Sequence, residues 1–305
     1  MTDPTRHTRE VTIALFVTLL WSSSWILIRV GLDDESLQPI SFAGLRYSVA
    51  AVALGAVIAA RPPLRRRVAQ LDRPTVRRFA VLGVVYFAVT QGAQFVAIDA
   101  QPAATSSLML APTALLVAVM SRRSIGEAVR LRQFAGSALI VVGAVLYFAG
   151  DLGATWIGMI ASIVGLVANA SGALLGRQVN RDADVSPVVV TAVSMAVGAS
   201  ILVVVGSVVE GPPQLSIASL AIIGWLAIVN TALAFTLWNA VQRRLAAVET
   251  AAINNTMLIQ IAVLAWVFLG ESPGVTGMAG IVVVSLGAFL SQAAPIRRRG
   301  HATSG

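Results

Sequence analysis

The sequence predicts an all-α integral membrane protein, in which ten transmembrane helices form two inverted five-helix repeats. Three observations predict this fold class: composition, a repeated set of glycines and the distribution of arginine. Of the 305 residues, 57% are hydrophobic and only 12% are charged, with a mean hydropathy of +0.82. An ordinary soluble domain carries about 25% charged residues. A soluble protein of this length could not cover its surface with so few charges, so the composition indicates a multi-span membrane protein.

Ten apolar segments approach or exceed the length needed to cross a bilayer as a helix, about 20 residues. In chain order they are 11–31, 40–60, 79–98, 103–120, 133–150, 153–175, 186–209, 216–241, 249–269 and 275–293. The connections are short, and the longest has 18 residues, so no soluble domain fits between them. We therefore expect a cytoplasmic tail, a first repeat, a second repeat and another cytoplasmic tail, at 1–10, 11–150, 151–293 and 294–305.

The two halves of the chain carry the same pattern of glycines. At an offset of 144 residues, Gly126, Glu127, Gly136 and Gly143 recur as Gly270, Glu271, Gly280 and Gly287. At an offset of 148, Arg29 corresponds to Arg177 and Pro39 to Pro187. Internal repetition of this length indicates one structural unit used twice. Because five spans is an odd number, the second unit must be inverted relative to the first, which is a transporter architecture.

Arginine supplies most of the positive charge, because lysine is absent, and its distribution predicts the orientation. With the N-terminus in the cytoplasm, 20 of the 22 arginines fall in cytoplasmic connections and tails, while the outer connections carry acidic residues and no arginine. This positive-inside pattern predicts a multi-pass protein of the plasma (inner) membrane with both termini cytoplasmic. The net charge of +8 therefore reflects membrane topology and does not indicate binding to nucleic acid.

Four stretches resemble successive segments of the EamA-type transporters, within the drug/metabolite transporter superfamily. They are Trp21-Ser22-Ser23-Ser24-Trp25 with Arg29-Val30-Gly31-Leu32, Pro39 with Ala43, Leu45 and Arg46, Ala103-Ala104-Thr105-Ser106-Ser107 with Ala111-Pro112, and Gly126-Glu127 with Gln133, Gly136 and Gly143. The resemblance covers nearly the whole chain and implies alternating-access movement of a small metabolite, commonly export. The second repeat departs from the pattern, since Asn255-Thr256 stands where the first has Ala111-Pro112. Pro112 is expected to bend the fourth helix.

Polar side chains gather in corresponding spans of the two halves. An amide that faces lipid leaves its donors and acceptors unpaired, so these side chains must face other helices or a wet cavity. Hydrogen bonding between helices is the alternative to lining a cavity. Because binding sites combine apolar walls with a few polar groups, we expect the substrate to contact Trp21, Tyr86, Gln91, Gln94, Asn169, Asn230, Trp238, Asn239, Asn254 and Asn255.

Three charged residues lie within spans or at their ends. Arg46 is about 10 Å deep, counted along the helix from Pro39, and is the candidate for binding an anionic group such as a carboxylate, with snorkelling or structural pairing as the alternative. Arg29 is expected to be an interfacial anchor. Glu249 opens the ninth span, where the helix dipole stabilises a carboxylate, and a role in proton coupling is its alternative.

Together these features predict a secondary transporter, expected to be an exporter, for a small amphipathic metabolite such as an amino acid. The alternatives are a drug or lipophilic-cation exporter of the same superfamily and a non-transporting membrane scaffold. An enzyme would lack its chemistry, since cysteine is absent, both histidines lie in the tails and no paired carboxylates lie in the spans. We expect no cofactor and no metal. The expected partners are a small-molecule substrate and the lipid bilayer, with a homodimer left open.

The predicted orientation can be tested by labelling from each side of the membrane. We expect residues 33–35 and residues 61–78 to react from opposite sides, because one predicted span separates residues 33–35 from the N-terminus and two separate residues 61–78 from it. Labelling of both segments from one side would contradict the ten-span topology.

Overall fold

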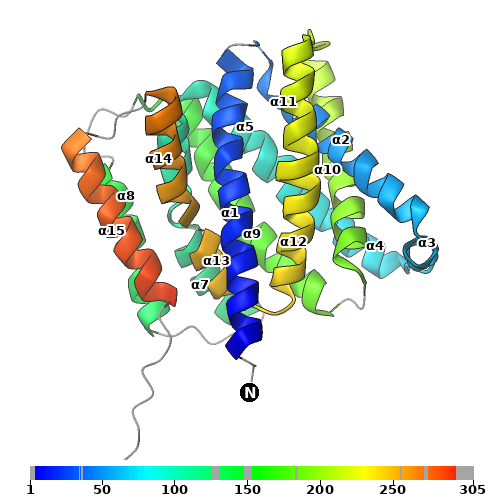
Figure 1. Cartoon of the computed structure of the whole chain (residues 1–305), viewed down its shortest axis with the longest axis horizontal. Coiled ribbons are helices and arrows are strands. Elements are labelled where there is room, and N and C mark those ends of the chain that lie inside the picture. Colours follow the sequence, from blue (N-terminus) through cyan, green and yellow to red (C-terminus); the bar gives the residue numbers. More distant parts are fainter. Residues whose placement is uncertain are drawn as a thin grey trace, which may run out of the picture.

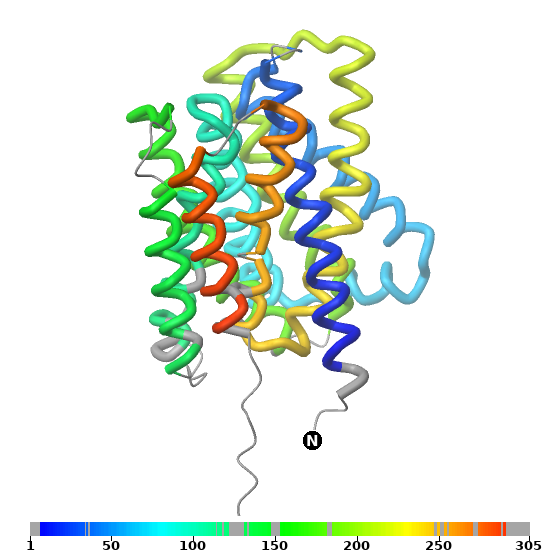
Figure 2. Tube along the Cα trace, turned by 60° about the vertical axis from the view of Figure 1, so that its left-hand side comes forward, coloured from blue at the N-terminus to red at the C-terminus, as the bar shows by residue number. Residues whose placement is uncertain are grey.

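The computed structural model describes residues 4–33, 35, 37–124, 131–147, 153–182, 185–254, 256–270 and 274–292. Within these residues every regular element is helical, and no strand occurs. The helices run side by side as a bundle of rods, except α3, which projects from its flank in both views (Figures 1 and 2). The all-α fold predicted from composition is confirmed.

The helices follow the order of the predicted spans. The first repeat contains α1 (Pro4–Asp33), α2 (Pro39–Ala60), α3 (Pro62–Ala69), α4 (Arg73–Leu82), the π-helical η1 (Gly83–Val89), α5 (Thr90–Ala100), α6 (Ala103–Leu108), α7 (Thr113–Ser124) and α8 (Leu131–Tyr147). The second contains α9 (Trp156–Asp182), α10 (Pro187–Val209), α11 (Ile217–Ala227), the π-helical η2 (Ile228–Leu233), α12 (Ala234–Gln242), α13 (Ala247–Asn254), α14 (Thr256–Leu269) and α15 (Gly274–Gln292).

Among the described residues, six continuous helical runs are long and apolar enough to cross a membrane. They are His7–Asp33, Pro39–Ala60, Arg73–Ala100, Trp156–Arg181, Pro187–Val209 and Ile217–Gln242. Shorter apolar helices occupy Phe134–Tyr147, Thr256–Leu269 and Gly274–Gly287. The fourth predicted span is divided into α6 and α7 just before and after Pro112, as expected for a residue that lacks a backbone donor. The count of ten spans stays a prediction for these shorter segments.

Side-chain contacts place the start of α1 and two sets of connections at opposite ends of the bundle. At one end, Glu10 near the start of α1 lies 2.6 Å from Arg244, just beyond α12. At the other end, the Ser216 hydroxyl before α11 donates a hydrogen bond to the Glu35 carboxylate after α1, and these segments meet at the top of Figure 1. This arrangement agrees with the predicted sidedness of the connections relative to one another.

The corresponding helices of the two repeats pack antiparallel, as inversion requires. The fifth helices of the repeats, α8 and α15, are in contact. Gly143 lies opposite Gly280 and Gly136 lies opposite Gly287, so the two helices run in opposite directions. Figure 1 shows this pair together at one edge of the bundle. These four glycines are the repeated positions that the sequence singles out, which confirms two repeats of opposite direction.

The glycines of this pair permit backbone contact that any side chain would prevent. A β-carbon on Gly280 would lie 2.6 Å from the carbonyl oxygen of Gly143, and one on Gly143 would lie 2.6 Å from the backbone nitrogen of Val284. Small residues allow such approach where lipid gives no hydrophobic drive for helix association. The matched glycines therefore form the packing seam between the two halves.

The second helices, α2 and α10, form another close antiparallel pair. A β-carbon on Gly206 would lie 3.0 Å from the backbone nitrogen of Ser41. Beyond the end of α10, the Glu210 carboxylate accepts hydrogen bonds from the backbone nitrogens of Ile40 at 2.9 Å and Ser41 at 2.7 Å. A carboxylate at a helix N-terminus satisfies free N–H groups and complements the helix dipole. Glu210 therefore caps the helix that carries Arg46.

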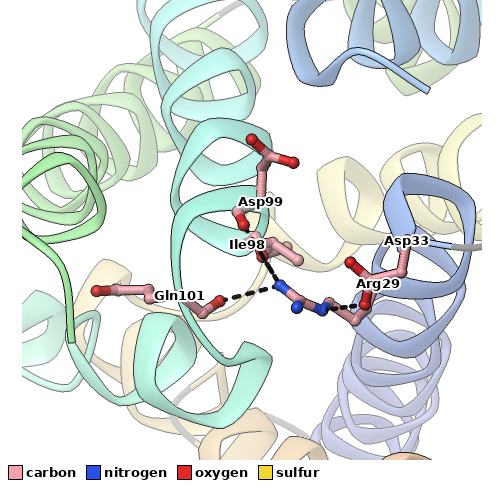
Figure 3. Close-up of polar contacts among 5 residues, drawn as sticks. All are labelled: Arg29, Asp33, Ile98, Asp99 and Gln101. Atoms are coloured by element: carbon pink, nitrogen blue, oxygen red, sulfur yellow. Dashed lines mark hydrogen bonds and ion pairs between the residues drawn. The ribbon is translucent and has the colours of Figure 1, made fainter. Parts of the chain in front are cut away.

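Arg29 holds the end of α1 to the end of α5 (Figure 3). Its Nη1 donates to the carbonyl oxygen of Ile98 at 2.6 Å, and its Nε lies 2.6 Å from the Asp33 carboxylate. The last carbonyls of a helix carry partial negative charge, so a guanidinium binds them well. Arg29 thus ties two helices together, which is more than the interfacial anchoring expected from its position in the sequence.

Arg177 makes the equivalent contact in the second repeat. Its Nη1 donates to the carbonyl oxygen of Gln242 in the last residue of α12. Gln242 lies 144 residues after Ile98, and Arg177 lies 148 residues after Arg29. In each repeat, an arginine therefore links the first helix to the C-terminal end of the third helix. We call these contacts the Arg29 and Arg177 clasps. Because the repeats are inverted, the two clasps lie at opposite ends of the bundle.

Adding one methyl group at the glycine seam tests its importance. We expect Gly280→Ala to lower the free energy of unfolding by about 1–3 kcal/mol, because overpacking moves the backbone of α8. Thermal unfolding in detergent measures the loss. Gly224→Ala is the matched control, since a β-carbon there meets nothing within 4 Å. An equal loss in both variants would refute the seam.

Candidate functional site

A cavity lies among helices of both repeats and holds about 670 Å³ of space free of atoms, part of it open to the outside. Seven predicted residues line it: Trp21, Arg46, Tyr86, Gln91, Gln94, Asn169 and Asn254. They come from α1, α2, η1, α5, α9 and α13. The structure thus brings together residues that are up to 233 positions apart in the chain.

The cavity is nearer to one end of the bundle. Ala97 is three residues from the C-terminal end of α5, and Ala161 is five residues from the start of α9. Both helix ends belong to the side predicted to face outward. The remaining lining therefore runs from this outer side toward the middle of the bundle.

Aromatic rings form one wall of the cavity. The ring of Phe235 in α12 lies with its centroid 4.8 Å from Trp21 and 5.8 Å from Tyr86. Behind Trp21, the buried ring of Trp238 follows at 5.0 Å. Aromatic pairs at these separations are favourable beyond the area that they bury. This aromatic cluster, Trp21, Tyr86, Phe235 and Trp238, joins α1, η1 and α12 and gives the cavity an apolar surface.

Arg46 contributes a positive charge to the lining although only 2% of its surface is exposed. Its Nε donates to the Thr231 hydroxyl at 2.7 Å, and its Nη2 donates to the Ser24 hydroxyl at 3.3 Å and to the Asn230 carbonyl at 3.5 Å. No carboxylate pairs with it among the residues that the structure describes, and its Nη1 makes no hydrogen bond there. A buried cation without an anion is costly, so its position favours a bound anion.

Both π-helical segments lie beside the cavity at equivalent points of the repeats. In η1 the Thr90 hydroxyl donates to the Val85 carbonyl at 2.8 Å, and the Gln91 amide donates to the Tyr86 carbonyl at 3.4 Å. In η2 the carbonyl of Asn230 is within reach of Arg46. Wider helical turns expose carbonyls and occur frequently at functional sites. Here the exposed carbonyls position the polar side chains of the lining.

Three amides of the lining have no hydrogen-bond partner in the described part of the chain: Gln94, Asn169 and Asn254. They lie on α5, α9 and α13, and each is partly buried. An amide offers two donors and an acceptor with two lone pairs. Gln91 differs from them, since its Oε1 accepts a hydrogen bond of 2.5 Å from the Tyr47 hydroxyl.

Three other predicted residues do not line the cavity. The Asn230 amide donates to the Ser23 hydroxyl at 2.9 Å and to the Leu20 carbonyl, so it joins η2 to α1. The Asn239 amide donates to Thr191 at 2.6 Å and accepts from Asn180 at 2.7 Å. Trp238 is 3% exposed and packs behind Trp21. Asn255 lies outside the described residues.

Glu249 is at the start of α13 and away from the cavity. Its carboxylate accepts a hydrogen bond of 3.1 Å from the backbone nitrogen of Ala246 and lies 3.8 Å from the His7 ring. A glutamate at this position satisfies a free N–H of the helix end. Of the lining residues in the described chain, none is acidic.

Several lining residues were not predicted, among them Trp25, Tyr47, Ser162, Phe235 and Met257. Tyr47 directly follows Arg46, and its ring lies 5.3 Å from that guanidinium. Phe235 precedes Trp238 by three residues, so both point to one side of α12. This spacing was the available signal for Phe235, whereas apolar residues such as Met257 resemble any other residue of a span.

The sequence matches a known protein family in both of its halves. The model of the EamA-like transporter family matches residues 8–149 and again residues 156–292. The chain belongs to the EamA-like transporter family. Members of this family are transporters and not enzymes. Membership, together with the apolar helices, makes the chain a multi-pass membrane protein.

Named relatives of this EamA-like chain match over nearly its whole length. The "Probable terminal-alkyne amino-acid exporter" of Streptantibioticus cattleyicolor is 28% identical over 287 residues, which cover 89% of this chain and 92% of the relative. The "Probable amino-acid metabolite efflux pump" of Escherichia coli is 23% identical over 297 residues, covering 93% and 94%. The protein of the same name in Salmonella typhimurium is 24% identical over 293 residues, covering 92% and 93%.

A solved structure described as "Crystal structure of protein" has a similar fold. It superposes with a TM-score of 0.72 at 18% sequence identity, over 93% of this chain and 96% of the other. Identity at this level speaks for the fold alone.

The stability of alanine variants tests which of the amides are hydrogen-bonded to neighbouring helices. We expect Asn239→Ala to lower the free energy of unfolding by about 1 kcal/mol, the scale of hydrogen bonds between membrane helices. Asn169→Ala should leave thermal unfolding unchanged, because that amide has no partner to lose. A larger loss of stability from Asn169→Ala would show that the two residues are assigned wrongly.

Proposed function

We propose that this protein is a secondary transporter that exports a small amphipathic metabolite of the amino-acid type by alternating access. The observation that carries the proposal is the lining of the cavity. It combines an arginine, amides and aromatic rings, and among the described residues the arginine has no carboxylate partner and three of the amides have no hydrogen bond. Three relatives support the substrate class and the direction, since one is named an amino-acid exporter and two are named amino-acid metabolite efflux pumps.

The carboxylate of the substrate would bind Arg46. Nε and Nη2 of Arg46 are held by protein groups, which leaves Nη1 of this lining residue without a hydrogen bond in the described structure. A guanidinium fixed in this way offers a charge-assisted hydrogen bond of defined direction. Gln94, Asn169 and Asn254 would satisfy the amino group and other polar groups, and the aromatic cluster would cover the apolar part.

The state described here is proposed to be open toward the outside. Its cavity is lined from the outer ends of α5 and α9, while the aromatic cluster and the Arg177 clasp close the other side. Rocking of one inverted repeat against the other would open the opposite end. We place the protein in the plasma membrane with both termini cytoplasmic, because the arginines of the connections gather on one side.

The charge of the cavity argues against the alternative of a lipophilic-cation exporter. A cation would have to approach Arg46 without a carboxylate in the lining to compensate, and like charges in a low-dielectric site repel strongly. Proton coupling through Glu249 has less support than helix capping, since its carboxylate is bound to the backbone of Ala246. A substrate gradient is the simpler driving force.

Transport by Arg46 variants tests the proposal. Proteoliposomes containing the wild-type protein should exchange a radiolabelled hydrophobic amino acid, and an excess of unlabelled amino acids of different side chains identifies the one preferred. We expect Arg46→Gln to reduce exchange at least tenfold, because the carboxylate loses its charged partner. Arg46→Lys should retain part of the activity, since it keeps the charge but lacks the planar fork.

Competition by substrate analogues separates binding of the carboxylate from damage to the fold. The amino-acid amide, which has no carboxylate, should compete poorly with the wild-type protein although its side chain is identical. Equal competition by the acid and the amide would overturn the role of Arg46. No exchange of any amino acid by a well-folded protein would overturn the proposed function itself.

A further inference from the structure

A second hollow lies between α4 and α9 at the end of the bundle that the arginine distribution assigns to the cytoplasm. Arg73, Arg77 and Arg78 of α4 line it, together with Val81, Leu175 and Val179. It is separate from the transport cavity and shares no lining residue with it. We call it the basic groove.

One of the three arginines, Arg73, lies in the first turn of α4, where a helix is least tolerant of positive charge. The three are the first, fifth and sixth residues of α4, and the N-terminal end of a helix favours anions. Arg73 and Arg77 are also four residues apart, a spacing at which like charges destabilise a helix. In the described structure none of the three makes an ion pair or a hydrogen bond through its side chain. The three guanidinium groups are exposed and keep their hydrogen-bond donors available for an anion.

Asp72 is a poor partner for these arginines because it already has a structural role. Its carboxylate accepts a hydrogen bond of 3.2 Å from the backbone nitrogen of Thr75 and so caps α4. That contact with Thr75 is the main reason that the pKa of Asp72 is lowered, and attraction by Arg78 contributes less. Asp72 therefore remains charged, but it is one carboxylate against three guanidinium groups.

The groove changes from charged to apolar along its depth. Val81 follows Arg73 by eight residues, about 12 Å along the helix, and is 42% exposed. Opposite it, α9 contributes the half-buried Leu175 and the buried Val179. A basic mouth at the membrane boundary thus leads to an apolar wall on the side of the hydrocarbon. This is the polarity of a phospholipid, with a headgroup above and acyl chains below.

The second repeat shows that the fold does not require these arginines. At the offset of 144 residues, the equivalent positions in α11 are Ile217, Ala221 and Ile222. That helix has a complete cap from Ser216 and Ser219 and carries no charge in its first turns. The basic groove is therefore a feature of one end of the molecule and not of the repeat.

We propose that the basic groove binds an anionic phospholipid, with its phosphate held by Arg73, Arg77 and Arg78 and its acyl chains against Val81 and Leu175. Guanidinium groups bind phosphate oxygens in pairs of parallel hydrogen bonds. Basic pockets between membrane helices on the cytoplasmic side suit such headgroups. The bound lipid would stabilise the junction of α4 with α9, and this role is independent of the transported substrate.

The test compares two triple variants of equal charge. The first replaces the groove arginines, Arg73→Gln, Arg77→Gln and Arg78→Gln, and the matched control replaces Arg61→Gln, Arg65→Gln and Arg66→Gln around α3. Each purified protein is titrated with dioctanoyl phosphatidylglycerol or dioctanoyl phosphatidylcholine, and the thermal midpoint is measured. We expect phosphatidylglycerol to raise the midpoint more than phosphatidylcholine in the wild type and the control, and this difference to vanish in the groove variant.

Native mass spectrometry of the wild type and the control supplies a second measurement, which remains valid if the groove variant does not fold. Retention of phosphatidylglycerol in preference to phosphatidylcholine by both proteins supports the site. If the control variant loses the preference for phosphatidylglycerol, the preference depends on total charge, and the groove is refuted as the binding site. The proposal also fails if the wild type has no preference, or if glycerol 3-phosphate at the same concentration produces the full thermal shift.

Discussion

The absence of hydrogen-bond partners in a lipid bilayer is the constraint on which this structure depends. Backbone groups are satisfied within helices, and side-chain polar groups must find partners on neighbouring helices. Asn230, Asn239 and Glu210 do so, and each ties together helices that are distant in the sequence. At the cavity this pairing is incomplete, because Arg46 and three amides keep capacity that no described protein group uses. Incomplete pairing beside an open space is the basis of the proposed binding site.

Inversion of one unit explains both the rigid and the asymmetric parts of the molecule. Equivalent helices meet antiparallel at the glycine seam and in the α2–α10 pair, and the Arg29 and Arg177 clasps close opposite ends. The centre is asymmetric, since η1 presents Tyr86 where η2 presents Asn230. Two scaffolds of the same design thus enclose a site lined by unbonded amides and by aromatic rings, with both repeats contributing to each set. Such a combination is needed to hold an amphipathic molecule in one orientation.

Charge has a separate role at each depth of the protein. In the connections, arginines set the predicted orientation, and at helix ends Arg29, Arg177 and Glu210 bind free backbone groups. Within the bundle, Arg46 is different because hydroxyls and a carbonyl hold it, while no carboxylate in the described part of the chain neutralises it. The basic groove repeats this imbalance at the surface, where Arg73, Arg77 and Arg78 lack partners in the described structure. Both places combine uncompensated positive charge with an adjacent apolar wall, and both therefore suit an amphipathic anion.

The sequence by itself determined the fold class, the two repeats and the residues of the glycine seam, because the cost of burying polar groups in lipid and the close approach of helices leave direct marks on composition and spacing. It also identified most polar residues of the cavity, as amides and an arginine within spans must face inward. Only the tertiary structure separated Asn169, which faces the cavity, from Asn239, which bonds to Asn180 and Thr191. Helical periodicity assigns a side chain to a face, but the helix opposite that face decides whether it meets a partner or an open space. For the same reason the aromatic wall around Phe235 and the capping role of Glu249 emerged only once the helices were packed.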